Sequence, residues 1–306
     1  PNDRFADDPA RPAYHPMPAA GWTNEPHGLI HDGERFRLFY QANPNGPFWS
    51  RIRWGQLTSP DLVHWSQAEP ALVPEPGFDQ AGIWVGNTFL DEKGDLHASY
   101  TGVNGVKAGI GMAAGRGGSA LEKSPGNPVI PDAPLGFEDF RDSFVWRRDG
   151  SWSMLVGSGR EPPDERGVAL LYRSDDLAEW DLVGTLDTGM AMAEGVYWEV
   201  PTLIPLATGR HALFVTTVER NELARGLYWL GDLKDTAFRA DTALPRAFDV
   251  FHRMLSPTFG RTTDGRLVAI GIVPGTQSLQ TRRARGWAHT FSLPREVRPC
   301  PAAGLC

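Results

Sequence analysis

The sequence predicts an all-β protein, a five-bladed β-propeller in which four-stranded sheets surround a central channel. Three observations predict this fold: a recurring turn glycine, a strand-like segment on each side of it, and no strongly amphipathic helical pattern of about 12 or more residues. The glycines are Gly33, Gly94, Gly150, Gly209 and Gly265, so the intervals between them are 61, 56, 59 and 56 residues. A β-sandwich with irregular hairpins is the alternative, but it would not give such constant spacing.

Each repeat begins with a predicted hairpin, because a short apolar segment precedes the glycine and a strand-like segment follows it. The segments before the glycines are residues 29–30, 88–90, 144–146, 202–204 and 258–259. The segments after them are residues 36–40, 96–100, 152–156, 211–215 and 267–272. Residues 53–57 and 168–172 are predicted third strands, and the similar motifs at 59–65 and 174–180 follow them at an offset of 115 residues, or two repeats. The segments after these motifs are the predicted fourth strands.

Composition and charge argue against several classes of partner. The 306 residues are 41% hydrophobic, which is enough for a large core, and 30 basic against 37 acidic residues give a net charge of −7. No basic run is present, so nucleic acid is not an expected partner. No apolar stretch reaches the roughly 18 residues of a membrane helix, and no signal peptide is recognised. The chain starts at Pro1 without Met, and both a secreted and a cytoplasmic location stay open, as does the oligomeric state.

The sequence predicts neither a cofactor nor a metal. Its two cysteines, Cys300 and Cys306, lie at the C-terminal end, where they can close only a small local loop. No Cys/His set has the spacing of a zinc site, and there is no glycine-rich dinucleotide or phosphate-binding motif.

The heads of the five predicted first strands carry an unusual set of side chains. Reading back from each turn glycine gives Glu25, Asn87, Asp142, Glu199 and Ser256. In a propeller these strand heads converge at one end of the channel, so three acids are expected to meet there. Clustered carboxylates repel and desolvate one another, which makes them costly unless they are used. The alternative is that they bond main-chain amides or hold a structural cation.

Such a cluster suits glycoside hydrolysis, in which one carboxylate is the nucleophile and another the general acid/base. Glu199 lies among Tyr197, Trp198 and Val200, so its pKa is expected to be raised, as a proton donor requires. Glu25 lies beside Asn24, a polar setting that suits an ionised nucleophile. Asp142 follows Arg141, whose charge is expected to keep that carboxylate ionised.

Six motifs, in order along the chain, resemble glycoside hydrolase family 32, the invertase, inulinase and levanase family. Residues 22–28 read WTNEPHG and are similar to its WMNDPNG signature. The others are YQANPNGPFW at 40–49, WG at 54–55 with DLVHW at 61–65, FRDS at 140–143, WEVP at 198–201 and SLPRE at 292–296. They resemble the family's YQxNP, WGHxxSxDLxHW, FRDP, WECP and LPRE blocks. Taken together, the resemblance covers about residues 22–296.

The resemblance implies an exo-acting retaining β-fructofuranosidase with Glu25 as nucleophile, Glu199 as acid/base and Asp142 as transition-state stabiliser. Residues implied to bind the terminal furanose are Asn24, Gln41, Trp49, Trp84, Asn87 and Arg141. The implied organisation is an N-terminal extension at 1–21, a catalytic propeller at 22–296, and at 297–306 the start of a C-terminal β-sandwich that is truncated or absent. The implied partner is an oligo- or polysaccharide.

Several positions depart from the family pattern, among them Glu25 for Asp, His27 for Asn, Val85 for Ser and Ser143 for Pro. The longer side chain of Glu25 extends the carboxylate by roughly 1.5 Å, about one C–C bond. Alternatives to a fructofuranosidase are therefore a fructosyl- or furanosyltransferase and a hydrolase of an unusual furanoside, such as a difructose anhydride or an arabinofuranoside. A non-catalytic sugar-binding propeller is a further alternative.

Overall fold

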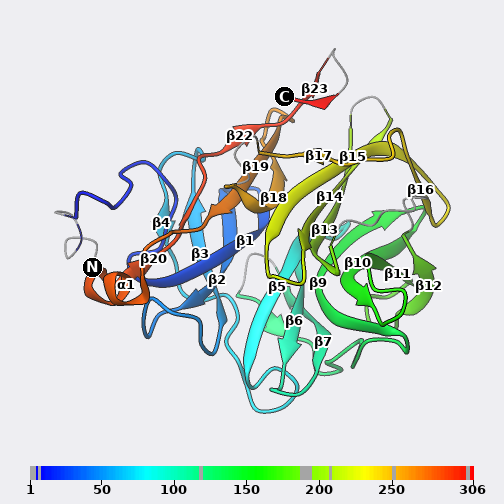
Figure 1. Cartoon of the computed structure of the whole chain (residues 1–306), viewed down its shortest axis with the longest axis horizontal. Coiled ribbons are helices and arrows are strands. Elements are labelled where there is room, and N and C mark those ends of the chain that lie inside the picture. The colour runs from blue at the N-terminus through cyan, green and yellow to red at the C-terminus, as the bar shows by residue number, and fades with distance from the viewer. Residues whose placement is uncertain are drawn as a thin grey trace.

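The protein is a five-bladed β-propeller, as predicted. The computed structural model describes residues 5, 8–116, 120–186, 195–206, 209–249, 253–300 and 304–306. Five antiparallel sheets, named here blades I to V in chain order, surround a central axis, and the first strand of each blade lies nearest the middle (Figure 1).

The blades share one plan, in which consecutive strands pair with their neighbours. Blade I contains β1 (Gly21–His31), β2 (Phe36–Asn43), β3 (Arg53–Ser59) and β4 (Ser66–Gln67). Blade II contains β5 (Gly82–Leu90), β6 (Leu96–Val103), β7 (Ala108–Gly115) and β8 (Glu122–Lys123). Blade III contains β9 (Phe137–Arg148), β10 (Ser151–Arg160), β11 (Gly167–Ser174) and β12 (Asp181–Thr185).

Blades IV and V have less regular outer edges. Blade IV contains β13 (Tyr197–Pro205), β14 (His211–Val218), β15 (Ala224–Lys234) and β16 (Ala237–Ala240), with β17 (Arg246–Ala247) also pairing with β15. Blade V contains β18 (Leu255–Arg261) and β19 (Leu267–Val273), completed by β21 (Thr290–Phe291) and β22 (Arg295–Glu296). The short strand β20 (Trp287–Ala288) pairs in parallel with β1, which ties blade V to blade I and closes the ring.

The repeated sequence signals correspond to repeated structure. All five turn glycines connect the first and second strands of their blades, with positive φ angles between 77° and 102° that suit glycine. The motifs at 59–65 and 174–180 also adopt one conformation. In each, an aspartate, Asp61 or Asp176, accepts hydrogen bonds from two following main-chain amides. The Trp at the end of each motif, Trp65 or Trp180, packs against a buried hydrophobic cluster.

The hydrophobic core is divided among the five interfaces between neighbouring blades. One cluster lies between each pair, and the largest fully buried side chains include Trp54 between blades I and II and Trp229 in the cluster between blades III and IV. Each fully buried large side chain contributes about 1.5–3 kcal/mol through the hydrophobic effect. The blades are therefore fixed relative to one another, which keeps the channel mouth rigid.

Every innermost strand has a break in register near its head, where it faces the channel. The interruptions lie between Thr23 and Pro26 in β1, between Ile83 and Gly86 in β5, between Arg141 and Phe144 in β9, between Glu199 and Thr202 in β13, and between Leu255 and Thr258 in β18. A β-bulge of this kind re-aims side chains that regular pleating would direct into the sheets on either side. The five bulges therefore present side chains at one mouth of the channel.

Two C-terminal features complete the fold. Residues 279–285 form the short helix α1 (Leu279–Arg285), whose N-terminus is capped by Ser278. A hairpin of β23 (Pro299–Cys300) and β24 (Gly304–Leu305) carries a disulfide between Cys300 and Cys306. None of the helices in the described parts of the chain is long and apolar enough to cross a membrane.

Candidate active site

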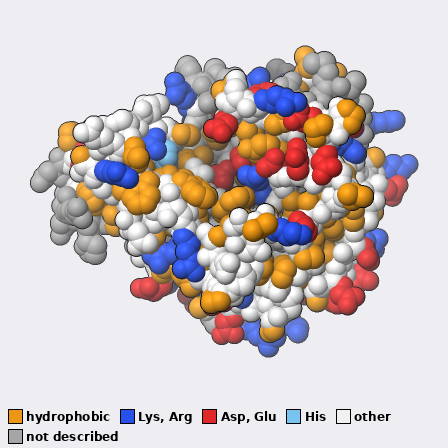
Figure 2. Space-filling model, turned by 60° about the horizontal axis from the view of Figure 1, so that its bottom comes forward, with side chains coloured by type: hydrophobic (Ala, Val, Ile, Leu, Met, Phe, Trp, Pro, Cys, Tyr) orange, Lys and Arg blue, Asp and Glu red, His pale blue; other side chains and the backbone are white. Residues whose placement is uncertain are grey.

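The bulges of three blades bring three carboxylates into one pocket. This pocket has a volume of about 270 Å³ and is lined by Asn24, Glu25, Gln41, Trp49, Trp84, Arg141, Asp142 and Glu199. Figure 2 shows acidic and basic side chains gathered around a hollow on one face of the molecule, with hydrophobic side chains nearby. The lining includes all three acids that the sequence analysis placed at strand heads, and five of the six residues implied to bind sugar.

Glu25 is held by a neighbouring blade. It lies in the β1 bulge with only 9% of its surface exposed, and its Oε1 accepts a 2.7 Å hydrogen bond from Ser256 Oγ in blade V. Ser256 has a left-handed φ of 45°, and its main-chain amide donates a 3.0 Å hydrogen bond to Thr216 Oγ1. A non-glycine residue in this conformation is uncommon and is maintained only by its surroundings. Blades IV and V therefore fix the hydroxyl that orients Glu25.

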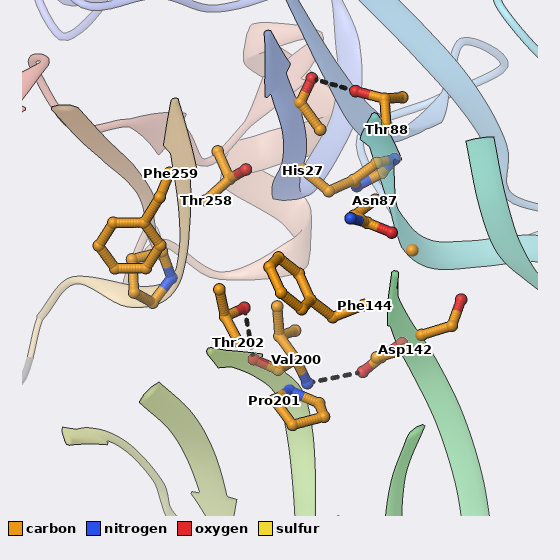
Figure 3. Close-up of a pocket in the computed structure, with 14 residues that line it drawn as sticks. His27, Asn87, Thr88, Asp142, Phe144, Val200, Pro201, Thr202, Thr258 and Phe259 are labelled. Carbon is orange, nitrogen blue, oxygen red and sulfur yellow. Dashed lines mark hydrogen bonds between the residues drawn. The ribbon is translucent and has the colours of Figure 1, made fainter. Parts of the chain in front are cut away.

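Asp142 forms the floor of the pocket. It is 3% exposed and has a positive φ of 60°, and its own amide donates a 2.8 Å hydrogen bond to Thr101 Oγ1 of blade II. Its Oδ2 accepts a hydrogen bond of 3.3 Å from the amide of Val200 in blade IV (Figure 3). Asp142 therefore sits between three blades.

Glu199 enters the pocket beside the guanidinium of Arg141. Arg141 Nη1 lies 3.4 Å from Glu199 Oε1, and Arg141 also pairs with Asp139. The guanidinium stacks between two aromatic rings, 5.0 Å from the centre of Trp84 and 4.9 Å from that of Tyr197. These contacts restrain Arg141, which is the only cation among the described residues that line the pocket.

Amide and indole groups complete the wall. Asn24 Nδ2 donates a 3.0 Å hydrogen bond to Gln41 Oε1, which fixes both side chains across β1 and β2. Trp49, on the loop between β2 and β3, is 63% exposed, so its indole face is free for contact. Together these groups offer the aromatic surface and polar atoms that sugars require.

Asn87, the sixth residue implied to bind sugar, does not line this pocket. It lines a separate small cavity of about 40 Å³ in the channel beneath the pocket (Figure 3). Its amide is committed to blade III, since Nδ2 donates to Val145 O and Oδ1 accepts from Val145 N, both at 2.9 Å. The cause is register: Asn87 comes one residue after the end of the β5 bulge, whereas Trp84 lies within it. The geometry gives Asn87 a structural role that links two blades.

The pKa values of the cluster differ from the sequence-based expectations in two of three cases. The pKa of Glu199 is raised by burial, as expected. The expectation of an ionised Glu25 in a polar setting is wrong, because burial and the charges of Glu199 and Asp142 raise its pKa well above the usual range. Burial and Glu199 raise the pKa of Asp142 to about 7, and Arg141 only partly opposes this. The three groups therefore titrate as one interacting set.

His27, which follows the Glu25 bulge, is a neutral structural residue. Burial lowers its pKa to about 3, and its ring packs 4.2 Å from that of Trp54. Its Nδ1 lies 3.1 Å from the main-chain oxygen of Glu25, so the neutral ring donates a hydrogen bond to the bulge.

Ser256, Asp139 and Tyr197 contact the cluster but were given no role from the sequence. Ser256 was predicted only to lie at the head of a first strand, beside the three acids. That shared position is the feature of the sequence that could have identified it. Tyr197 is adjacent to the motif at 198–201, whereas Asp139 had no distinguishing pattern. Among the side chains that the structure describes, no group of three or more His, Cys, Asp or Glu residues is arranged to hold a metal ion.

Paired carboxylates at the mouth of a propeller, beside exposed tryptophan, define the site of a carbohydrate-processing protein. Residues 15–301 match the family described as glycosyl hydrolases family 32, N-terminal domain, and the chain belongs to this family. It is 31% identical to a sucrose-6-phosphate hydrolase from Escherichia coli, over 94% of this chain and 62% of that protein. It is 32% identical to an insoluble β-fructofuranosidase isoenzyme from Arabidopsis thaliana, over 94% of this chain and 57% of that protein.

A solved structure shares the architecture. A fructan 1-exohydrolase from Cichorium intybus, in complex with 1-kestose, superimposes with a TM-score of 0.86 at 25% identity, covering 97% of this chain and 60% of that one. The chain thus spans about 60% of the length of these relatives.

Proposed function

We propose that this protein is an exo-acting retaining glycoside hydrolase that releases terminal β-fructofuranosyl residues from sucrose- or fructan-type substrates. The observation that carries the proposal is the convergence of Glu25, Asp142 and Glu199 from three blades on a single pocket of about 270 Å³. The relatives support the substrate class, since they include β-fructofuranosidases and a fructan exohydrolase.

The proposed reaction proceeds by double displacement. Glu25 attacks the anomeric carbon of the furanosyl residue while Glu199 donates its proton to the departing oxygen, so that the glycosidic bond breaks as the glycosyl–enzyme bond forms. Glu199 then removes a proton from water, which attacks the same carbon and releases the sugar from Glu25. Asp142, on the pocket floor, would bind ring hydroxyls as positive charge develops on the sugar.

The electrostatics of the pocket favour the protonated form of both proposed reactive acids. Burial raises the pKa of Glu199, which keeps a proton available for the leaving group. Burial and the charges of Glu199 and Asp142 raise the pKa of Glu25 well above its usual range, and Ser256 and Arg141 only partly oppose this rise. The proposed role of Glu25 as nucleophile therefore rests on its position in the pocket and on its motif, and not on its pKa.

The pocket shape supports removal of one terminal residue at a time. Asp142 lines both the pocket and a cavity of about 40 Å³ in the channel, which is also lined by His27 and Asn87. This cavity is far smaller than a sugar residue, so the part of the channel lined by these described residues does not admit a polysaccharide.

The side chain of Glu25 has one methylene more than the aspartate of the family motif, and its place in the fold restrains that longer side chain. Glu25 lies on a β-bulge, and its carboxylate reaches Ser256 of blade V at 2.7 Å. We infer that Glu25 is the nucleophile in spite of its extra methylene, because this hydrogen bond restrains the added freedom of the side chain.

The test is release of free sugar from a panel of furanosides by wild type, Glu25→Gln and Glu199→Gln. We expect fructose from sucrose and 1-kestose with wild type, and a loss of at least about 10³-fold in both variants, because each lacks one half of the chemistry. Full activity in either variant would overturn its assigned role. Saturable sugar binding by the wild type without any product would instead support a non-catalytic sugar-binding propeller.

A further inference from the structure

An open groove continues from the catalytic pocket along the boundary of blades II and III. Its volume is about 560 Å³, and it shares Trp49, Trp84 and Arg141 with the pocket. The rest of its lining comes from Ala81, from residues 103 and 105–108 around the turn between β6 and β7, from residues 132–133, and from residues 139–140 near the start of β9. Because the groove opens beside Arg141, which contacts the acid/base Glu199, a leaving group released by that residue would lie in it.

Carboxyl groups outnumber cations along this path, and the three in the catalytic pocket have raised pKa values. The pocket and the groove together are lined by the carboxyl groups of Glu25, Asp132, Asp139, Asp142 and Glu199, against two cations, Lys107 and Arg141. Both cations are already paired. Lys107 forms an ion pair with Asp132, and Arg141 pairs with Asp139 and Glu199 while stacked between two aromatic rings. In the described lining, no cation is left for an anionic ligand.

The remaining surface suits an uncharged sugar. Trp49 and Val106 are 63% and 90% exposed, so an indole ring and an apolar side chain face solvent at the groove. An aromatic face binds the C–H face of a sugar, while the ion pairs along the groove present donors and acceptors to its hydroxyl groups. A phosphate in the groove would meet the carboxylates of Asp132 and Asp139 at close range, where like charges repel.

Resting on the proposed function, we propose that this groove receives the leaving sugar and selects substrates in which that sugar is not phosphorylated. The protein would cleave sucrose and short fructans in preference to sucrose 6-phosphate, whose phosphate is on the departing glucosyl unit. The inference separates this chain from relatives named as sucrose-6-phosphate hydrolases, to which it is about as similar as to β-fructofuranosidases.

The rival interpretation makes Lys107 a phosphate receptor. Its ion pair with Asp132 is largely exposed, with side-chain exposures of 59% and 42%, and exposed pairs hold little energy. A phosphate that displaced Asp132 would, however, leave that carboxylate beside it in the groove. The two interpretations therefore predict opposite substrate preferences.

The experiment compares kcat/KM for sucrose, 1-kestose and sucrose 6-phosphate at low and high salt. We expect sucrose 6-phosphate to be at least about tenfold poorer than sucrose, with the difference narrowing at high salt because salt screens exposed charges. A kcat/KM for sucrose 6-phosphate equal to or above that for sucrose would overturn the inference while leaving the proposed function intact. No sugar release from any of the three would instead overturn the proposed function.

A charge variant sharpens the comparison. Asp132→Asn removes one repelling carboxylate and frees Lys107, so we expect kcat/KM for sucrose 6-phosphate to rise about 3–10-fold relative to that for sucrose. The matched control is Asp264→Asn, which removes an exposed acid paired with Arg266 in the distant β18–β19 turn, and should change neither value. An unchanged ratio in Asp132→Asn, or a fall in it, would contradict the inference.

Discussion

At the scale of single residues, Ser256 determines where the Glu25 carboxylate lies. It donates a 2.7 Å hydrogen bond to Glu25 Oε1, and this bond lowers the pKa of a carboxyl group that burial and neighbouring acids raise. Ser256 itself is held by Thr216, through the 3.0 Å hydrogen bond from its main-chain amide. The residue is a positioning group, since it acts on the substrate only through Glu25.

Removing this hydroxyl should change the pH dependence of activity. In Ser256→Ala the pKa of Glu25 rises further, so the acid limb of the kcat/KM profile moves to higher pH. A hydrogen bond to a charged group contributes about 1.5–3 kcal/mol, so activity on the acid side should fall at least about tenfold. The control is Thr258→Val, which loses the 3.3 Å hydrogen bond that Thr258 Oγ1 accepts from the main-chain amide of Leu29 in β1. Identical profiles for the two variants would show that Ser256 acts only on stability.

Shortening the side chain of Glu25, the proposed nucleophile, should not raise the activity. Glu25→Asp draws the carboxylate back by about 1.5 Å and breaks its contact with Ser256. A misplacement near 1 Å costs on the order of 10²-fold in rate, and we expect a loss of that size in kcat/KM for sucrose. If Glu25→Asp were as fast as the wild type, the position of the bound substrate, and not the β1 bulge, would set the distance between the carboxylate and the anomeric carbon.

Some of the residue-scale chemistry could be predicted from the sequence. Glu25, Asp142, Glu199, Asn24 and Arg141 stand in recognisable motifs, and their convergence follows from the repeat. The raised pKa values of Glu25 and Asp142 could not be predicted, because they depend on burial and on distances between blades. Asn87 was predicted to bind sugar because the sequence does not show where the β5 bulge ends. Asn87 lies one residue beyond that bulge, and this position decides which way its side chain points.

At the scale of elements, the bulges in the innermost strands determine what faces the channel mouth. Gly86 ends the bulge in β5 and pairs with Tyr100 of β6. A Cβ atom at Gly86 would lie 1.8 Å from the main-chain oxygen of Ser99, which cannot move without breaking the sheet. Glycine at this position therefore allows β5 and β6 to approach closely at the end of the bulge that contains Trp84.

Substituting two glycines of β5 by alanine should distinguish the cost of a collision with the backbone from the general effect of replacing glycine on stability. Gly86→Ala should lower the free energy of unfolding by about 2–4 kcal/mol, because the added methyl collides with backbone. Gly82→Ala is the matched control, since its nearest neighbour would be 3.4 Å away, an ordinary contact, and its change should stay within about 1 kcal/mol. Denaturant titration measures both. Equal effects at the two positions would contradict the close-approach explanation.

The elements that repeat were predictable, and those that interrupt the repeat were not. The hairpins at the five turn glycines and the motifs at 59–65 and 174–180 follow from local sequence. The helix α1, the edge strand β17 and the parallel strand β20 that closes the ring do not recur in other blades. The strand β20 depends on pairing with β1 at the other end of the chain, and β17 depends on pairing with β15 within blade IV. A periodic pattern does not encode such contacts.

At the scale of the whole molecule, the carboxylate cluster lowers stability at neutral pH. The pKa of Asp142 is about 7 in the folded protein, against about 3.9 in an unfolded chain. Below pH 4 both states hold the proton. Between about pH 4 and pH 7 the unfolded state loses it while the folded state keeps it, so the free energy of unfolding falls as pH rises.

Asp142→Asn should therefore abolish activity and stabilise the fold. We expect a gain of about 1–3 kcal/mol at pH 7 and little gain at pH 4, measured as thermal unfolding at both values. The control is Asp79→Asn. This buried acid is paired with Lys123, so its loss should destabilise the protein at pH 7. A Tm for Asp142→Asn below that of the wild type at pH 7 would show that the cluster is not under electrostatic strain.

The measurement that tests the central claim most directly is the capture of the glycosyl–enzyme intermediate. Glu199→Gln would be mixed with a β-fructofuranosyl fluoride, whose leaving group needs little help from an acid, so that attack proceeds while hydrolysis of the intermediate stalls. Mass analysis should then find one added furanosyl residue, on the peptide that contains Glu25. An adduct on another residue, or rapid turnover with no adduct at all, would contradict the account.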